Sequence, residues 1–226
     1  MTNKRVDRRH AAKTIVRPTD TVAGAQQFRT ARSRDRNRRI REAATALFLE
    51  YGYDGVSIDD VVRRVGGSKA TVYSQFANKE ALFVTVIEDL SDEFVAELKA
   101  VSTSRMGLEN GLRRIANKLL EILLRPRHLA YWRLIVSEAA RIPEVTRAWF
   151  RHGPAASSHF IAGFIAHHQQ TGTVRRIDPE QAATLFHDMA ITSIFHRAVI
   201  GDTPSEAEIE STVNLAVKIF VHGTRS

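Results

Sequence analysis

A short stretch after a pair of glycines carries polar side chains at a spacing suited to recognition chemistry. Lys69, Thr71, Ser74 and Gln75 lie on the outward face of the helix that this stretch predicts, together with the small residue Ala70. An ammonium group neutralises a phosphate, hydroxyls donate and accept hydrogen bonds, and a glutamine amide pairs with adenine in a bidentate way. The stretch therefore predicts a surface that approaches a nucleic acid and reads its base edges.

The elements that must position these residues are two short helices joined by a sharp turn. Ser57 is a favourable N-cap, and Asp60 stands three residues later, where a capping acid belongs. Gly66 and Gly67 allow the backbone to turn between the helices, and Ser68 caps the second one. This order predicts a helix-turn-helix, whose second helix enters the major groove of DNA.

Contacts to phosphates are expected around the second helix. Lys69 and Lys79 flank it and can neutralise phosphates, while the helix N-termini at Ser57 and Ser68 offer free backbone N–H groups to phosphate oxygens. The alternative is that both lysines only solvate a surface and that Tyr73 belongs to the core. Short helical hairpins are common, so the pattern by itself leaves both interpretations open.

The excess of positive charge lies in the first third of the chain. The net charge is +8; residues 1–80 hold 17 Lys or Arg and 9 Asp or Glu, whereas residues 81–226 hold 16 of each. A basic head on a neutral body suggests a polyanionic partner for the head alone, although a basic segment can also be merely solvated.

The extreme N-terminus predicts a basic, disordered arm over residues 1–33, because apolar periodicity is lacking there. Its cationic side chains Arg5, Arg8, Arg9 and Lys13 would follow phosphates or a minor groove, or touch nothing.

Apolar periodicity predicts an all-α chain from Arg34 onward. Residues 34–80 form the expected DNA-binding domain, and residues 81–226 the expected ligand-binding and dimerisation domain. One long helix from Asn78 to about Val101 joins them. Prolines delimit the further predicted helices, which are Leu108–Leu124, Arg127–Arg141, Glu144–Gln170 (kinked or split at Pro154), Pro179–Ile200 and Pro204–His222.

The composition excludes several classes of site. The chain contains no cysteine, so neither disulfides nor thiolate metal sites are possible. No apolar run approaches the length needed to span a bilayer, and no secretion signal is visible at the N-terminus. We therefore expect a soluble cytoplasmic protein with no membrane partner.

Residues 39–83 resemble the N-terminal, AcrR-like domain of the TetR family of bacterial repressors. The similar features are an A-x-x-L-F-x-x-x-G-Y run from Ala44, the S-K-x-T-x-Y core at Ser68–Tyr73 and the F-x-x-K-E-x-L-F tail at Phe76–Phe83. The resemblance implies a three-helix DNA-binding domain followed by a larger helical domain. It also implies a homodimeric repressor that a small-molecule ligand releases from a palindromic operator. Such a repressor would lie in the bacterial cytoplasm and associate with the nucleoid when bound to DNA.

Carried over by position, the resemblance implies two kinds of DNA contact. The residues similar to phosphate contacts are Ser57, Ser68, Tyr73 and Lys79, and those similar to groove contacts are Lys69, Thr71, Ser74 and Gln75. Ala70 stands where the family usually has glycine, and Gln75 where it often has histidine. These two departures concern which operator is bound rather than whether DNA is bound.

The C-terminal half, from SEAARIPEVTRAWFRHGP at Ser137–Pro154 onward, is similar to the AefR-like C-terminal domain. This similarity suggests that the helices Pro179–Ile200 and Pro204–His222 pair with their copies in a four-helix bundle, or else pack within one chain. Thr203, with Glu206 three residues later, is the predicted start signal of the last helix.

An unknown small hydrophobic ligand would bind among the helices of the body. Residues of the type that line such pockets are Trp132, Trp149, Phe160, Phe164 and His187, although each is also a plausible core residue.

Two other functions are compatible with parts of the sequence. A metal-responsive regulator would use the body histidines, which are His152, His159, His167, His168, His187 and His196. A non-specific nucleic-acid binder would use residues 1–41, which carry 13 positive and 3 negative charges. No H-E-x-x-H, Walker loop or glycine-rich dinucleotide turn is present, so we expect no enzyme, no cofactor and no metal site.

Overall fold

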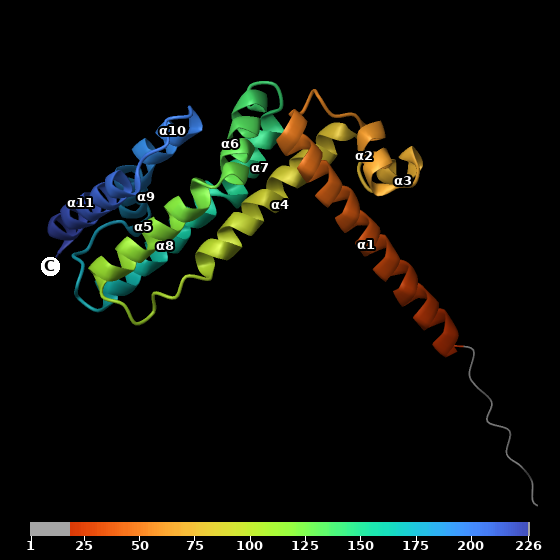
Figure 1. Cartoon of the computed structure of the whole chain (residues 1–226). Helices are drawn as coiled ribbons and strands as arrows, with labels where there is room; N and C mark the ends of the chain where they lie inside the picture. Colours follow the sequence, from red (N-terminus) through yellow and green to blue (C-terminus); the bar gives the residue numbers. More distant parts are fainter. Residues whose placement is uncertain (1–18, 226) are drawn as a thin grey trace, which may run out of the picture. The chain divides into compact units, whose positions relative to one another are not determined.

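The computed structural model describes the backbone of residues 19–225 and the side chains of residues 32–225. It is helical, as predicted, and the described residues form no strand beyond one isolated bridge between Val174 and Arg225. The elements in chain order (Figure 1) are α1 (Thr19–Tyr51), α2 (Ile58–Val65), α3 (Lys69–Tyr73), α4 (Lys79–Lys99), α5 (Leu108–Leu123), α6 (Pro126–Glu138), α7 (Pro143–His152), α8 (Pro154–Gln170), α9 (Pro179–His187), the π-helix η1 (Asp188–Thr192), α10 (Ser193–Val199) and α11 (Glu206–Thr224).

The first helix begins before its predicted start. Its backbone is helical from Thr19, whereas the sequence predicted helix only from Arg34. The weak apolar periodicity of the intervening residues does not prevent a helix, because that stretch contains no proline. The predicted DNA contacts of the arm, Arg5, Arg8, Arg9 and Lys13, lie outside the described residues.

The chain divides into two units, residues 1–39 and residues 40–226. In the described part of the first unit, Arg38 donates a hydrogen bond to Asp35 at 2.6 Å, one turn apart on α1. The second unit contains the end of α1 and all the other elements.

The predicted helix-turn-helix is present, and the predicted caps define it. Ser57 accepts a hydrogen bond from the Asp60 backbone N–H, and the Asp60 carboxylate accepts one from the Ser57 backbone N–H at 2.8 Å. Gly66 and Gly67 adopt φ values of 78° and 125°, which residues with a Cβ rarely adopt, so the turn depends on them. Ser68 then caps α3, and Asn78 caps α4.

The helix-turn-helix shares its hydrophobic core with part of the body. The core beneath it includes Ile40, Phe48, Val61 and Phe83, all nearly inaccessible to solvent. The same cluster continues through the buried faces of α6 and α7, which supply Tyr131, Leu134, Ile135, Ile142, Val145 and Ala148. The predicted domain boundary after residue 80 therefore falls inside a continuous core, and it stays a prediction.

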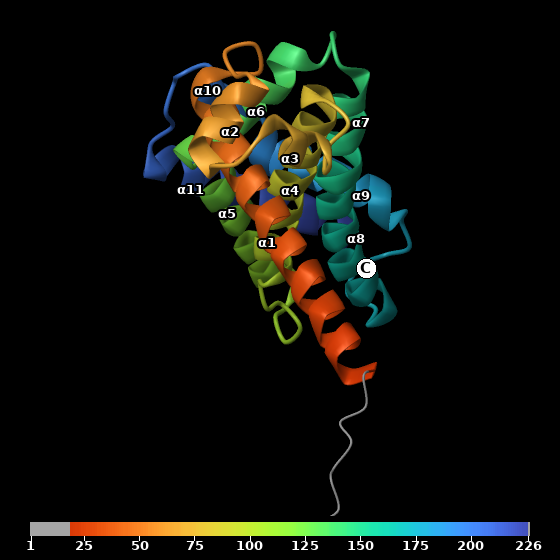
Figure 2. The same ribbon diagram turned by 90° about the vertical axis from the view of Figure 1, so that its right-hand side faces the viewer.

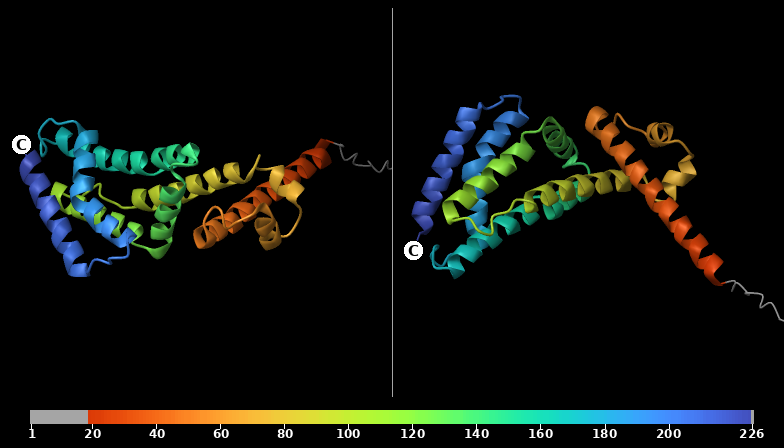
Figure 3. Two further views of the ribbon diagram at one scale, coloured as in Figure 1. Left: turned by 90° about the horizontal axis from the view of Figure 1, so that it is seen from above. Right: turned by 60° about the horizontal axis from the view of Figure 1, so that its bottom comes forward.

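The second core lies in the body, where α5 packs between the C-terminal part of α4 and α11. The predicted helix over residues 144–170 was expected to be kinked or split at Pro154, and it is split there into α7 and α8. Figure 2 shows these two helices following each other along one side. Both panels of Figure 3 show α11 alongside the segment that contains α9 and α10.

Two details of the C-terminal helices differ from the prediction. The expected helix Pro179–Ile200 is interrupted by η1, whose wider turns set its five residues apart from α9 and α10. The last helix is capped by Ser205, with Glu208 completing the capping box, rather than by Thr203. The Arg197 guanidinium also pairs with Glu208 at 3.2 Å and so supports that carboxylate at the helix start.

Candidate DNA interface and ligand cavity

The outward face of α3 is exposed and its inward face is buried. Val72 and Phe76 keep 3% and 7% of their surface and belong to the core, as predicted. Tyr73 keeps 49%, so it is not a core residue, and its assignment to DNA stays a prediction. The remaining predicted contact residues of the turn and helix are exposed, apart from the half-buried Thr71; these are Ser68, Lys69, Ala70, Ser74 and Gln75.

Lys69 takes part in a contact that sequence reasoning did not predict. Its ammonium lies 2.9 Å from the Asp59 carboxylate of α2, and this hydrogen bond raises the pKa of Lys69. The pair links the two helices of the motif at the surface. Lys69 therefore stays charged at the start of α3, but Asp59 already compensates part of its charge in the absence of DNA.

Lys79 lies at the start of α4 against an aromatic ring. Its ammonium is 4.1 Å from the centre of the Tyr53 ring, close enough for a cation–π contact. Burial lowers the pKa of Lys79. Ser57, at the start of α2, is exposed like the residues of α3.

Tyr53 also connects the loop before α2 to the segment that follows α6. The Arg141 guanidinium lies 5.0 Å from the ring centre and donates a hydrogen bond to Asp54 at 2.9 Å. It also pairs with the buried carboxylate of Glu138 on α6. Tyr53 and Asp54 belong to the loop that leads into α2, so Arg141 connects this loop to α6.

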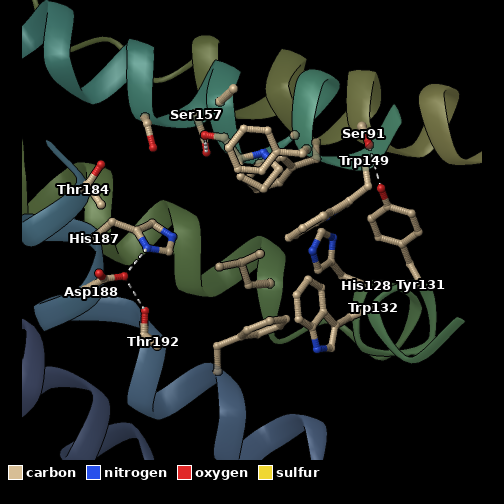
Figure 4. Close-up of a pocket in the computed structure, with 18 of the residues that line it drawn as sticks. Ser91, His128, Tyr131, Trp132, Trp149, Ser157, Thr184, His187, Asp188 and Thr192 are labelled. Atoms are coloured by element: carbon tan, nitrogen blue, oxygen red, sulfur yellow. Dashed lines mark hydrogen bonds and ion pairs between the residues drawn. The ribbon is translucent and has the colours of Figure 1, made fainter. Parts of the chain in front are cut away.

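A cavity of about 470 Å³ lies in the body. Every element from α4 to α10, including η1, contributes residues to its lining (Figure 4). Ser91 of α4 and Tyr131 of α6 share a hydrogen bond of 2.6 Å at one edge, and burial raises the pKa of the Tyr131 hydroxyl. The lining residues are Ser91, Phe94, Leu123, His128, Tyr131, Trp132, Trp149, Phe150, Gly153, Pro154, Ala155, Ser157, Ser158, Glu180, Thr184, His187, Asp188, Thr192, Phe195 and His196.

One end of the cavity is aromatic. Trp132 and Trp149 meet edge to face with ring centres 4.9 Å apart, and Phe195 meets Trp132 in the same way at 5.5 Å. His128 lies beside them in Figure 4, and burial lowers the pKa of this imidazole to about 4. The imidazole is therefore neutral at pH 7.

The opposite end is polar and is built around η1. The Asp188 carboxylate accepts a hydrogen bond from the Thr192 hydroxyl at 3.0 Å, and it lies 3.6 Å from Nδ1 of His187. Burial lowers the pKa of His187, and the nearby Asp188 only partly opposes this effect. Thr184 and Ser157 face the same space in Figure 4.

Three of the five predicted ligand residues line the cavity, namely Trp132, Trp149 and His187. Phe160 and Phe164 do not, and the prediction is corrected for them. Phe164 is buried against α5, where its ring occupies the space that a side chain at Gly111 would need. Phe160 packs partly buried against the same core.

Sequence reasoning missed other lining residues, notably His128, Tyr131 and Phe195. A helical stripe identifies residues that face inward. It does not distinguish a residue that faces a cavity from one that faces a packed core, because both are buried and apolar.

The body histidines do not gather into a metal site. Among the described residues, no group of three or more His, Asp or Glu side chains is arranged to hold a metal ion. His152 instead pairs with Asp92 at 2.9 Å, and His159 with Glu180 at 2.8 Å. In the described part of the chain, no helix is both long and apolar enough to cross a membrane.

Comparison with known families agrees with this architecture. Residues 40–86 match the family described as bacterial regulatory proteins, tetR family. Residues 110–223 match the C-terminal domain of AefR-like transcriptional repressors. These matches support neither a metal-responsive regulator nor a non-specific binder that acts through the basic arm.

Individual proteins show the same likeness. The HTH-type transcriptional repressor ComR of Escherichia coli is 37% identical over 59 residues, which are 26% of this chain and 28% of ComR. A TetR-family regulator from Mesorhizobium loti has a TM-score of 0.73 and 29% identity, covering 86% of this chain and 99% of the other. The flavonoid-responsive regulator FrrA has a TM-score of 0.75 and 28% identity, covering 84% and 97%.

Proposed function

Because this chain belongs to the TetR family of transcriptional regulators, we propose that it is a repressor released from its operator when a small molecule enters the body cavity. The observation that carries the proposal is the exposed face of α3, held at a fixed angle by the buried Val72 and Phe76. Regulation of transcription through the helix-turn-helix is the family's activity. The contact residues, the palindromic operator and release by a small molecule are what we propose for this chain.

Recognition of DNA is assigned to α3 and its surroundings. The residues that face the major groove are Lys69, Ala70, Thr71, Ser74 and Gln75. Among them, Gln75 pairs with a base edge. Contacts to the phosphates come from Ser57, Ser68, Tyr73 and Lys79. The exposure of the Tyr73 ring and the position of Lys79 over Tyr53 support this division.

Dimerisation is assigned to the predicted segments Pro179–Ile200 and Pro204–His222. These segments expose large apolar side chains, a feature that marks protein interfaces. The side chains are Leu185, Met189, Ile200, Leu215 and Ile219, with exposed fractions from 38% to 82%. A two-fold dimer would present two copies of α3 to successive major grooves about 34–36 Å apart.

The ligand would act through the two helices that reach from the cavity to the head. α4 lines the cavity at Ser91 and begins at Lys79 beside the DNA surface. α6 lines it at Tyr131 and Trp132, and Arg141, just beyond its end, contacts Asp54. A ligand that prefers the DNA-incompetent state shifts the population toward it, with a coupling free energy of about 1–3 kcal/mol.

Selection of bound duplexes from a random DNA pool tests this proposal. We expect a palindromic product whose half-sites are one helical turn apart, bound by two chains. A product without symmetry, or no enrichment of any sequence, would contradict dimeric, specific recognition. Repeating the selection without residues 1–33 separates the helix-turn-helix from the arm, since the same palindrome must emerge if α3 reads the bases.

A further inference from the structure

The charge of the cavity lining selects against anions. Among the lining residues, there is no lysine or arginine, and the carboxylates of Glu180 and Asp188 are the acidic groups. Two of the three lining histidines, His128 and His187, are neutral at pH 7, because burial lowers their pKa values, and the third, His196, is exposed to solvent. A ligand carboxylate or phosphate would lose its hydration without gaining a lysine or arginine partner, which is costly.

The π-helix sets the direction in which His187 accepts hydrogen bonds. Asp188 is held by the Thr192 hydroxyl at 3.0 Å and faces Nδ1 of His187 at 3.6 Å. An adjacent carboxylate favours the tautomer with its proton on Nδ1, so Nε2 keeps its lone pair. In Figure 4 the other ring nitrogen of His187 points into the cavity, toward the side where the tryptophans lie.

The opposite wall favours a flat, apolar ring system. Trp132 is flanked edge to face by Trp149 and Phe195, and such faces and edges pack well against another aromatic ring. The cavity volume of about 470 Å³ is of the size that holds a small organic ligand.

We propose that the cavity binds a neutral hydroxylated aromatic compound, whose rings lie against Trp132, Trp149 and Phe195 and whose hydroxyl donates a hydrogen bond to Nε2 of His187. The inference rests on the proposed function, because it presumes that this cavity is the ligand site. It adds the chemical class of the ligand and the residue that distinguishes a hydroxyl from other substituents.

Calorimetric titration of the full chain with three matched probes tests the inference. The probes share one ring system and differ in one group: 2-naphthol, 2-methoxynaphthalene and naphthalene-2-carboxylate. We expect 2-naphthol to bind about five- to tenfold more tightly than the methoxy compound, the effect of one hydrogen bond in a buried site. The carboxylate is expected to bind most weakly.

Variants of His187 locate the effect. His187→Phe keeps a ring but has no acceptor, so the preference for 2-naphthol over 2-methoxynaphthalene should vanish. His187→Gln offers an amide oxygen and should retain part of that preference. His167→Phe is the matched control, since His167 is exposed and does not line the cavity; it should bind all three probes like the unchanged protein.

The outcomes distinguish a failure of the proposed ligand class from a failure of the cavity as the ligand site. Equal affinities for 2-naphthol and its methyl ether, or a preference that survives in His187→Phe, would overturn the role of His187. Tightest binding of the carboxylate would overturn the selection against anions. If no probe binds while the same preparation binds its selected DNA, the cavity is not the ligand site, and the ligand part of the proposed function fails with the inference.

Discussion

Arg141 and Asp54 form an ion pair of 2.9 Å that joins the segment after α6 to the loop leading into the helix-turn-helix. Tyr53 adds a further contact, because its ring centre lies 5.0 Å from the Arg141 guanidinium and 4.1 Å from the Lys79 ammonium. The head and the α6 end of the body are thus tied by polar contacts as well as by their common core. Movement of α6 at the cavity would act directly on this loop.

Replacing Arg141 should loosen the loop that precedes α2. Exposed ion pairs contribute up to about 1 kcal/mol, so we expect amide hydrogen exchange in residues 52–57 to accelerate by up to about fivefold in Arg141→Ala. Exchange measured by mass spectrometry checks this. The control is Arg147→Ala, because Arg147 pairs with Glu144 within α7. The same acceleration in both variants would contradict a specific tie through Arg141.

Tyr73→Phe should weaken binding to every DNA sequence alike. The exposed hydroxyl is assigned to a phosphate, and a hydrogen bond to a charged group contributes about 1.5–3 kcal/mol. We expect at least about a tenfold rise in Kd for the selected operator and for a scrambled duplex, measured by fluorescence anisotropy at one salt concentration. A loss restricted to the operator would mean that Tyr73 reads sequence instead.

Gln75→Ala should alter the order in which sites are preferred. A bidentate contact to a base discriminates by about 1–3 kcal/mol, so one position of each half-site should become degenerate. Repeating the selection from a random pool with this variant measures the change. An unchanged ranking of sites would remove Gln75 from the reading surface.

The proposed dimer surface should be sensitive to charge at its apolar residues. Leu215 and Ile219 lie one turn apart on α11 with 58% and 53% of their surface exposed. Leu215→Glu should shift sedimentation toward the monomer, because a buried, unpaired carboxylate is costly. Val136→Glu on α6 is the matched control, since Val136 is equally exposed at 56% and lies outside the proposed surface. If both Leu215→Glu and Val136→Glu sediment as monomers, or if neither does, this surface is not the dimer interface.

The buried imidazole of His128 should make the fold less stable in acid. Its pKa is lowered to about 4 by burial, below the ordinary value of 6.5. The unfolded chain therefore binds the proton more readily between these values, so stability is complete above pH 6.5 and is lost as the pH falls toward 4. Between pH 7 and pH 5 this group alone should cost about 2 kcal/mol in the free energy of unfolding.

Urea unfolding at the two pH values measures the loss. In His128→Phe the difference between pH 7 and pH 5 should shrink by about that amount, whereas the exposed control His222→Gln should keep it. If His128→Phe retains the full pH dependence, another group is responsible.

The local elements were predictable from the sequence because their signals are local. A cap such as Ser57 and a glycine such as Gly66 act within one turn, so the helix-turn-helix and its exposed face could be predicted without knowledge of the fold. The start of α1 could not be predicted from periodicity, because the residues from Thr19 to Ser33 are helical without an apolar stripe. The cap of α11 was misplaced because Thr203 and Ser205 both satisfy the local rule, and the distant Arg197 pairs with Glu208.

The cavity could be decided only by the tertiary structure. Residue type predicts a cavity position for Trp132, Trp149 and Phe164 alike, but Phe164 fills the space beside Gly111 instead. The π-helix η1 brings Asp188 and Thr192 together beside His187, and Arg141 contacts Asp54. No periodicity in the sequence predicts either contact. A sequence specifies which face of a helix is buried, whereas the partner of that face, and any space left between them, depends on how whole helices pack.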